Sequence, residues 1–288
     1  MPMNQKLLRP RSTIHPEAAA WATRVVANGG SVSGTTLNAV SKFCASIASA
    51  GIRSKFYRLN LFCGTGLSAC LVPLYRGPSL GGAQYGGTTD TNFNFVSGDY
   101  SETAGLTTTS GGWKYLNTGL SPDNMALADV QAMHLAFSHG PTSSGDLDPR
   151  PIGSNSAGDR FQVVLSIRSS VAGSLSSALG RTAAATSSAL AIGAQASASW
   201  LMARTSSTAL SIYKNGASDA TLTTSVTGIL SHANAFTVGR VNNAGTIIGD
   251  SVALGHRHYS IGAAMTASQV ASYELALSAF RSAMGRTA

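Results

Sequence analysis

Charged side chains are scarce in this chain of 288 residues, of which Asp, Glu, Lys and Arg make up only 11%, where about a quarter is usual. Glutamate is the rarest of them, and Glu17, Glu102 and Glu274 lie far apart. Local catalytic motifs built on glutamate are therefore excluded. Because 43% of the residues are hydrophobic, the chain is too apolar for a disordered polymer. We expect a folded protein with much uncharged surface.

Cysteines are also few, and long apolar runs are missing. Cys44, Cys63 and Cys70 make an odd count, and no secretory signal precedes them, so we expect buried thiols and no disulfide framework. The spacing of Cys63 and Cys70 does not fit a zinc site. No run approaches the roughly 18 apolar residues of a membrane span. The sequence therefore predicts a soluble protein made in a cytoplasm, with no membrane partner.

Small residues dominate instead, since Ala, Ser, Thr and Gly together make up close to half of the chain. A monomer normally keeps its surface charged, so this composition predicts contacts with other subunits, including copies of the same chain. The net charge is +8, but the basic residues are scattered, apart from Lys6, Arg9 and Arg11. This pattern argues against direct nucleic-acid binding. It indicates a basic arm that binds a protein partner.

The order of patterns divides the chain into four parts: a basic N-terminal arm (1–12), a small helical unit (13–80), a Gly-rich linker (81–91) and a β-rich domain with a final helix (92–288). In the helical unit, capping and periodicity predict helices from Pro16 to Gly29, from Ser33 or Thr35 to Gly51, and around Leu67 to Leu71. The final helix begins at a capping box, Thr266 to Gln269, and ends at Gly285.

Between residues 92 and 262, short segments of β-branched and aromatic residues alternate with turn residues. Asn215-Gly216 predicts a hairpin turn with positive φ at both residues. Glycines interrupt the Ala/Ser tract 169–199, which predicts strands and loops there. Together these segments predict an antiparallel β-sandwich or jelly roll. The expected strands are Phe93 to Val96, Trp113 to Leu116, Met133 to Ser138, Phe161 to Ile167, Trp200 to Ala203, Ala209 to Tyr213, Ala220 to Val226, Phe236 to Val238 and His256 to Ile261.

Two resemblances follow from the order of these segments. MHLAFSHG, FQVVLSI, ALSIYKNG, FTVGRV and the closing SIGAAMTASQVASYELAL resemble a laminin-G or concanavalin A-like lectin domain, over about Thr91 to Ala288. This likeness implies a jelly-roll sandwich. The combination of HPEAAAWATRVVANGG, LVPLYRG, TNFNFVSGDYSETAGL and GGWKYLNTGL is similar to virion proteins of tailed bacteriophages, over nearly the whole chain.

The second resemblance implies a structural protein of the virion, assembled in the host cytoplasm. It would be a capsid-surface (decoration) or tail (fibre or tip) component that contacts other virion proteins. The alternatives are a carbohydrate-binding receptor module that recognises host-surface glycans and a polysaccharide hydrolase. Glycosidases need paired carboxylates, and no expected strand carries an acidic cluster. The sequence therefore indicates binding and no enzymatic activity.

Three candidate sites have ordinary explanations beside the functional ones. His256 and His258 flank Arg257 on one strand, which places them on one face for a shared metal, but an ordinary strand face is favoured. Asp146, Asp148 and Asp159 suit calcium at the rim of a sandwich, but a solvated turn is favoured and no cofactor is expected.

The third candidate is an aromatic pair. Trp113 and Tyr115 alternate with Lys114 on an expected strand, where exposed rings could stack on sugars as in lectins. Packing in the core is the favoured interpretation, because a chain with 7% aromatic residues uses most of them inside.

Overall fold

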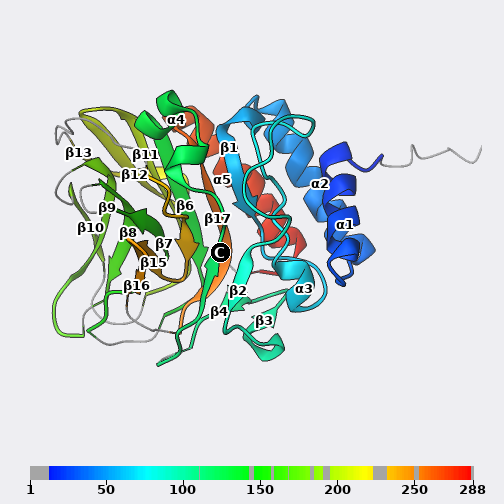
Figure 1. The fold of residues 1–288 in the computed structure, drawn as a ribbon, viewed down its shortest axis with the longest axis horizontal. Helices are drawn as coiled ribbons and strands as arrows, with labels where there is room; N and C mark the ends of the chain where they lie inside the picture. Colours follow the sequence, from blue (N-terminus) through cyan, green and yellow to red (C-terminus); the bar gives the residue numbers. More distant parts are fainter. Residues whose placement is uncertain are drawn as a thin grey trace, which may run out of the picture.

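The computed structural model describes residues 13–286 except for six internal segments (143–145, 157–158, 182–184, 191–194, 223–231 and 250–252) and the single residues 110 and 168. The basic arm with Lys6, Arg9 and Arg11 lies outside the described residues. The described chain forms two sheets packed face to face, with helices on one side of the pair (Figure 1). The predicted β-sandwich is thus confirmed.

One sheet, here called the covered sheet, lies next to the helices. Its strand β17 pairs with β6, and β1 (Phe56–Asn60) and β4 lie along the other side of β17. Its order is β13 (Ala217–Leu222), β12 (Ala209–Lys214), β11 (Ala198–Ser206), β6 (Met133–His139), β17 (Gly255–Ala263), β4 (Gly105–Thr107) and β3 (Tyr100–Ser101).

The other sheet is here called the uncovered sheet. Its pairings are antiparallel except where the hairpin of β15 (Val241–Asn243) and β16 (Thr246–Ile248) lies parallel to β7. Its order is β10 (Ala185–Leu190), β9 (Gly173–Arg181), β8 (Asp159–Ser166), β7 (Ile152–Asn155), β14 (Thr237–Val238), β5 (Tyr115–Asn117) and β2 (Thr91–Phe93).

The helical layer consists mainly of α1 (Pro16–Ala27), α2 (Gly34–Ser49) and α5 (Ala267–Ala283). Ser33 and Thr266 accept hydrogen bonds from backbone N–H groups of the first turns, as the caps predict. Short α3 (Gly66–Cys70) and α4 (Leu127–Gln131) complete the helices, and 3-10 turns lie at Arg53–Lys55, Ser97–Asp99 and Pro122–Asn124. All four helices that the sequence predicts are present.

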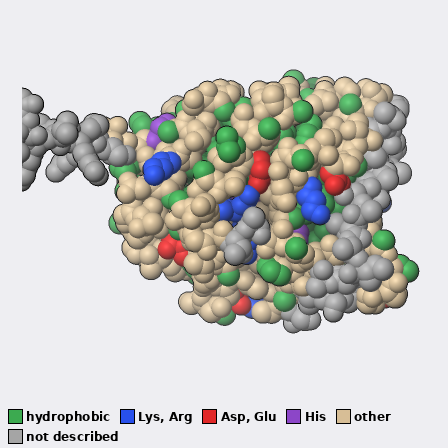
Figure 2. Space-filling view, turned by 180° about the vertical axis from the view of Figure 1, so that it is seen from behind, with side chains coloured by type: hydrophobic (Ala, Val, Ile, Leu, Met, Phe, Trp, Pro, Cys, Tyr) green, Lys and Arg blue, Asp and Glu red, His purple; other side chains and the backbone are tan. Residues whose placement is uncertain are grey.

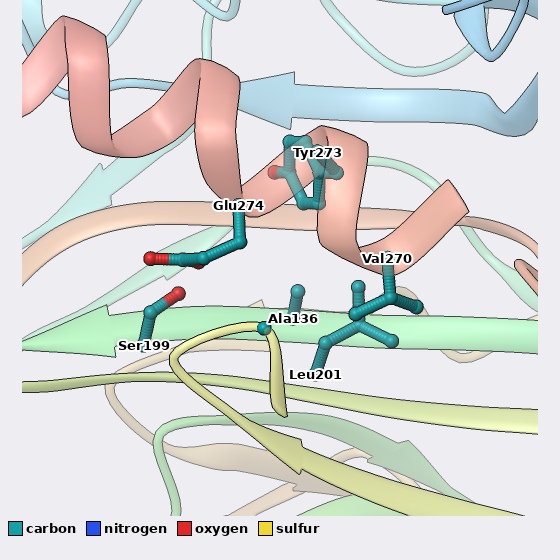
Figure 3. A pocket seen from close by; sticks show the side chains of 7 residues that line it. Ala136, Ser199, Leu201, Val270, Tyr273 and Glu274 are labelled. Carbon is teal, nitrogen blue, oxygen red and sulfur yellow. The ribbon is translucent and has the colours of Figure 1, made fainter. Parts of the chain in front are cut away.

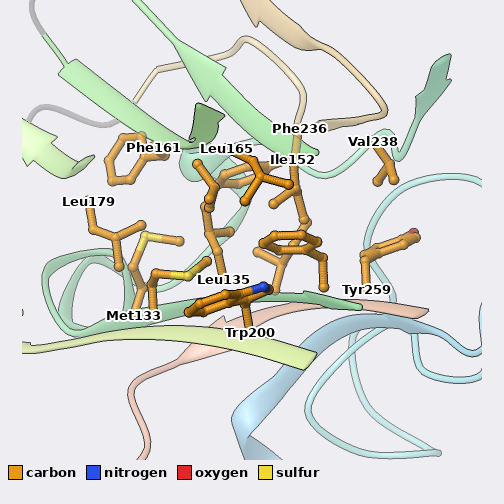
Figure 4. Packing of buried hydrophobic residues seen from close by; sticks show 14 of the residues in the cluster. Met133, Leu135, Ile152, Phe161, Leu165, Leu179, Trp200, Phe236, Val238 and Tyr259 are labelled. Atoms are coloured by element: carbon orange, nitrogen blue, oxygen red, sulfur yellow. The ribbon is translucent and has the colours of Figure 1, made fainter. Parts of the chain in front are cut away.

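Two apolar clusters hold these layers together. The sandwich core lies between the sheets, where Ile152, Phe161 and Leu165 of the uncovered sheet face Leu135 and Trp200 of the covered sheet (Figure 4). The helix-side core lies between the covered sheet and the helices, and it joins residues such as Trp21, Phe43, Phe56, Leu201 and Tyr273. Each face of the covered sheet is therefore buried.

Most of the expected strands overlap observed strands within the described residues, and several further strands join them. The strand expected at Phe93 to Val96 was placed too late, because β2 ends at Phe93. The one expected at Ala220 to Val226 overlaps β13 up to Leu222 and then lies outside the described residues.

At the Asn215-Gly216 turn the φ angles are 51° and 80°, as the hairpin requires. The Ala/Ser tract contains β9 and β10. β1 was not predicted, because Arg58 and Asn60 interrupt its apolar pattern, although the whole strand is buried.

A buried polar network holds the Gly-rich segment 81–91 against β1. Arg58 and Asp90 form an ion pair of 2.8 Å, and both side chains are fully buried. The Tyr259 hydroxyl donates to Asp90 at 2.7 Å, and the Arg58 guanidinium also donates to the Tyr85 carbonyl at 2.8 Å. This network ties the segment to the covered sheet.

The surface is as poor in charge as the composition suggests. Figure 2 shows a face on which the charged side chains are few among hydrophobic and uncharged groups. None of the described helices combines the length and the apolar character that crossing a membrane requires.

Candidate functional site

Trp113 and Tyr115 lie on the outer side of the uncovered sheet. Trp113 is 59% exposed and Tyr115 is half-buried. Leu116 has the opposite orientation and is fully buried in the sandwich core. The interpretation of this aromatic face as core was therefore wrong, because the alternation along the strand gives the inward position to Leu116.

Phe93 completes an aromatic group at the edge of this sheet. It lies directly opposite Tyr115 in the pairing of β2 with β5, and the two rings stack with centroids 4.3 Å apart at an interplanar angle of 7°. Partial burial raises the pKa of Tyr115, so its hydroxyl stays protonated and can donate a hydrogen bond. We call Phe93, Trp113 and Tyr115 the aromatic edge.

Arg240 supports the Trp113 ring. The guanidinium carbon lies 4.1 Å from the ring centroid, a geometry in which the cation is attracted to the ring face. Arg240 is itself buried and donates to the carbonyls of Gly112 and Gly249. One face of the indole is thus backed by a fixed group, and most of the residue remains open to solvent.

The neighbouring polar groups fix the backbone under the aromatic edge. The Lys114 ammonium lies 2.6 Å from the Asp99 carboxylate. Burial alone would raise the pKa of Asp99, but hydrogen bonds from Lys114 and from the Val96 N–H lower it. The Asn94 amide donates to the Trp113 carbonyl at 2.8 Å. These contacts hold the strand ends that carry the rings.

His256 and His258 do not share a face, which corrects the sequence interpretation. A β-bulge lies between them in the pairing of β17 with β6, and a bulge changes the side to which the next side chain points. His256 points into the sandwich, toward Gly239 directly after β14 of the uncovered sheet: a Cβ atom added to Gly239 would lie 3.6 Å from His256 Nε2. The His258 ring instead packs edge-on against Tyr273 of α5, with centroids 6.0 Å apart.

These two histidines belong to a group of four buried histidines on β6 and β17, which also includes His134 and His139. Burial lowers the pKa of His134 and His139 to about 4 and that of His256 to about 3. The pKa of His258 is lowered as well, by burial and by the charges of Arg281 and Arg286. All four are neutral near pH 7.

The three aspartates proposed for calcium lie in different surroundings. Asp146 accepts hydrogen bonds from the N–H and the hydroxyl of Ser169, whereas Asp159 is 2% exposed at the start of β8. In the parts of the chain that the structure describes, these three carboxylates do not form a group with ligand atoms within 4.8 Å of one another. Calcium binding here stays the less favoured alternative to the absence of a cofactor, which remains a prediction.

The three cysteines are free and buried, as predicted. Burial raises the pKa of Cys44 and of Cys63 to about 12, and the pKa of Cys70 is raised as well. None of them has the exposed, thiolate-favouring surroundings of a nucleophile.

A cavity beneath α5 is too small for an organic ligand. It is lined by Ala136, Leu201, Val270 and Tyr273, with Ser199 and Glu274 pointing toward one another across it (Figure 3). Its volume is about 10 Å³, which is about the space of one water molecule. A sugar that binds near these residues must bind at the surface.

Comparison with known proteins shows the fold. No family model and no curated protein matches the chain. A solved structure described by the words "Cell entry of botulinum neurotoxin type C is dependent upon interaction with two ganglioside molecules" superposes with a TM-score of 0.52 at 11% identity, over 80% of this chain. The match covers 53% of that chain, so the present chain corresponds to about half of it.

Two further structures are similar at lower scores. One is a CBM40 domain of a Ruminococcus gnavus IT-sialidase bound to alpha2,3 sialyllactose, with a TM-score of 0.42, 10% identity and coverage of 57% of this chain and 93% of that chain. The other is domain 4 of an arabinanase of Geobacillus stearothermophilus in complex with arabinotriose, with a TM-score of 0.39, 14% identity and coverage of 65% and 82%.

Proposed function

We propose that this chain is a carbohydrate-binding module whose aromatic edge stacks against the sugar rings of a surface glycan. The observation that carries the proposal is the position of Trp113, which is 59% exposed and is backed on one ring face by a buried guanidinium. A supported ring that leaves most of its surface free is suited to contact with a ligand.

An aromatic ring that stays exposed does not contribute the stabilising free energy that its burial would provide. An aromatic side chain buries 150–250 Å² when it packs, and full burial of a large apolar side chain stabilises a protein by about 1.5–3 kcal/mol. In this chain most large aromatic residues are buried, whereas Trp113 and Phe93 at the aromatic edge are exposed. Contact with the C–H face of a sugar recovers part of that burial, and the Tyr115 hydroxyl can add a hydrogen bond.

The fold is compatible with this proposal. The neurotoxin structure shares the sandwich, and its description ties that toxin to ganglioside molecules. At 11% identity this supports a common architecture and no common site. The glycan class therefore has to come from binding experiments.

A glycan array followed by calorimetric titration of each positive glycan tests the proposal. We expect binding by the full chain and, in Trp113→Ala, a loss of affinity of about 30-fold, which corresponds to a hot spot of about 2 kcal/mol. Phe93→Ala should weaken binding as well. Val171 is 58% exposed elsewhere, so Val171→Ala is a matched control that should bind normally. Equal affinity in Trp113→Ala and Val171→Ala would contradict the proposal.

A place in a bacteriophage virion stays a prediction that rests on the sequence resemblance. One surface feature favours assembly: Leu275 of α5 is 74% exposed, and a shallow groove beside it is lined mainly by small uncharged residues of α2 and α5. Mass spectrometry and electron microscopy of purified particles test this. Removing residues 1–11 should abolish incorporation and leave the sandwich folded, and normal incorporation of that variant would contradict a docking role for the arm.

A further inference from the structure

Three different metal-ligating side chains converge where α1 meets α2. His15 precedes the first turn of α1, Glu17 lies in that turn, and Cys44 lies in α2. One ligand atom from each (an imidazole nitrogen, a carboxylate oxygen and the thiol sulfur) lies within 4.8 Å of the other two. Cys44 is fully buried and Glu17 is 6% exposed, while His15 is half-buried and lies toward the surface.

The surroundings of this group are polar inside a core that is otherwise apolar. The Tyr75 hydroxyl is buried and lies within interaction distance of the Cys44 thiol. The Arg53 guanidinium stacks over the Tyr75 ring at 3.8 Å and pairs with the Glu17 carboxylate. Burying such groups costs free energy unless they gain strong partners. Apolar packing alone does not explain why these polar and ionisable side chains lie together.

We infer that His15, Glu17 and Cys44 form a binding site for a divalent transition-metal ion of the zinc class. Nitrogen, sulfur and carboxylate oxygen are the donors that zinc takes in proteins, and three protein ligands leave a fourth position for water. Softer thiolate and imidazole donors disfavour magnesium and calcium. The site lies in the helical layer and is independent of the carbohydrate proposal.

Metal binding requires the three ligand atoms to move closer together and the Glu17 carboxylate to loosen its ion pair with Arg53. With bonds of about 2.0–2.3 Å, ligand atoms in a tetrahedral site are roughly 3.3–3.8 Å apart, so separations within 4.8 Å need to contract by about 1 Å. The hydrogen bond from the Glu17 N–H to His15 Nδ1 is long, at 3.3 Å, and can be given up. As the sulfur–metal bond forms, the thiol proton leaves to water. Bound metal would then fasten the start of α1 to α2.

Zinc chloride and cobalt chloride are the probes. The full chain, stripped with a chelator, should take up about one zinc per chain, and its melting temperature should rise by at least about 5 °C at a hundredfold excess over Kd. Cobalt should give a thiolate-to-metal charge-transfer band. His15→Ala and Cys44→Ala should each weaken zinc binding by more than about 100-fold, and Cys44→Ala should remove the band. Arg53→Met should tighten binding, because it frees the Glu17 carboxylate.

Cys63→Ala is the matched control, since Cys63 is a buried thiol outside the group, and it should bind zinc as the unchanged chain does. His15→Ala keeps the test decisive if Cys44→Ala fails to fold, because His15 is only half-buried. The inference is overturned if the stripped chain takes up no zinc, or if His15→Ala and Cys63→Ala bind it equally well.

Discussion

The outer faces of the two sheets differ in what covers them. The covered sheet packs against α1, α2 and α5 through a second apolar core, with a fully buried Trp21. The uncovered sheet has no such helical layer in the described chain (Figure 1), whereas Trp113 near its edge is 59% exposed. One face therefore uses its aromatic residues for stability and the other presents them to solvent. This contrast is why we propose the aromatic edge as the binding surface.

The contrast also extends to titratable groups. The four buried histidines lie on the central strands of the covered sheet, two of them inside the sandwich and two toward the helices, where His134 packs against Phe56 and His258 against Tyr273. Near the aromatic edge, by contrast, Lys114 and Asp99 form a charged pair. The covered sheet should thus be the acid-sensitive part of the molecule.

Acid should produce the largest effect. The folded-state pKa values of these histidines lie below the unfolded value of about 6.5, so the unfolded chain binds protons first as the pH falls. Their stability contribution is full above about pH 6.5 and is lost toward pH 4. At pH 5, His134, His139 and His256 should each cost about 2 kcal/mol, and His258 adds to the loss in the same direction. Urea unfolding at a series of pH values measures this, and a free energy of unfolding that stays constant from pH 7 to pH 4.5 would contradict it.

A pair of tryptophan variants should separate the two faces directly. Trp21 is 1% exposed and its Nε1 donates to the Val72 carbonyl at 3.0 Å, so Trp21→Ala should lower the free energy of unfolding by about 3–5 kcal/mol. Trp113→Ala should lower it by only about 0.5–1 kcal/mol, the contribution of an exposed cation–π contact. Chemical denaturation of both variants decides the matter. Equal destabilisation by the two variants would contradict the claim that only the covered face uses its tryptophan for stability.

Lys114→Ala should have a smaller effect. The two side chains of its pair with Asp99 are only 15% and 8% exposed, so removing the ammonium leaves a mostly buried carboxylate without its charged partner, at a cost of about 1–3 kcal/mol. Because the pair fixes the strand between Trp113 and Tyr115, we expect glycan affinity to fall as well. Lys42 is exposed on α2, so Lys42→Ala serves as the control. A loss of affinity in Lys42→Ala as large as that in Lys114→Ala would argue against a local role.

The smallest expected effect is the absence of hydrolysis, since we propose a binding module. Incubation with a panel of host polysaccharides should release no reducing ends above background. Release that disappears when one specific aspartate is changed to asparagine would show a catalytic site and contradict the proposal.

Most of the fold follows from local patterns in the sequence. The caps at Ser33 and Thr266 and the Asn215-Gly216 turn act over a few residues, so the sequence predicts them well. β1 escaped prediction because Arg58 and Asn60 are satisfied by Asp90, a residue 30 or more positions away in the chain. Such a long-range partner leaves no local signal.

The candidate sites show the same limit. Alternation predicted that Trp113 and Tyr115 share a face, but which face is exposed depends on the packing of Leu116 against the other sheet. The β-bulge that separates His256 from His258 depends on the register with β6. The grouping of His15 and Glu17 with Cys44 depends on how α1 packs against α2. Each of these features is tertiary, and sequence spacing alone does not reveal it.

The most direct test of the central claim is a crystal structure of the chain with a glycan that the array identifies. We predict a sugar ring stacked on the free face of Trp113, with further contacts to Phe93 or the Tyr115 hydroxyl. A glycan bound elsewhere, with the aromatic edge still open to solvent, would contradict the account.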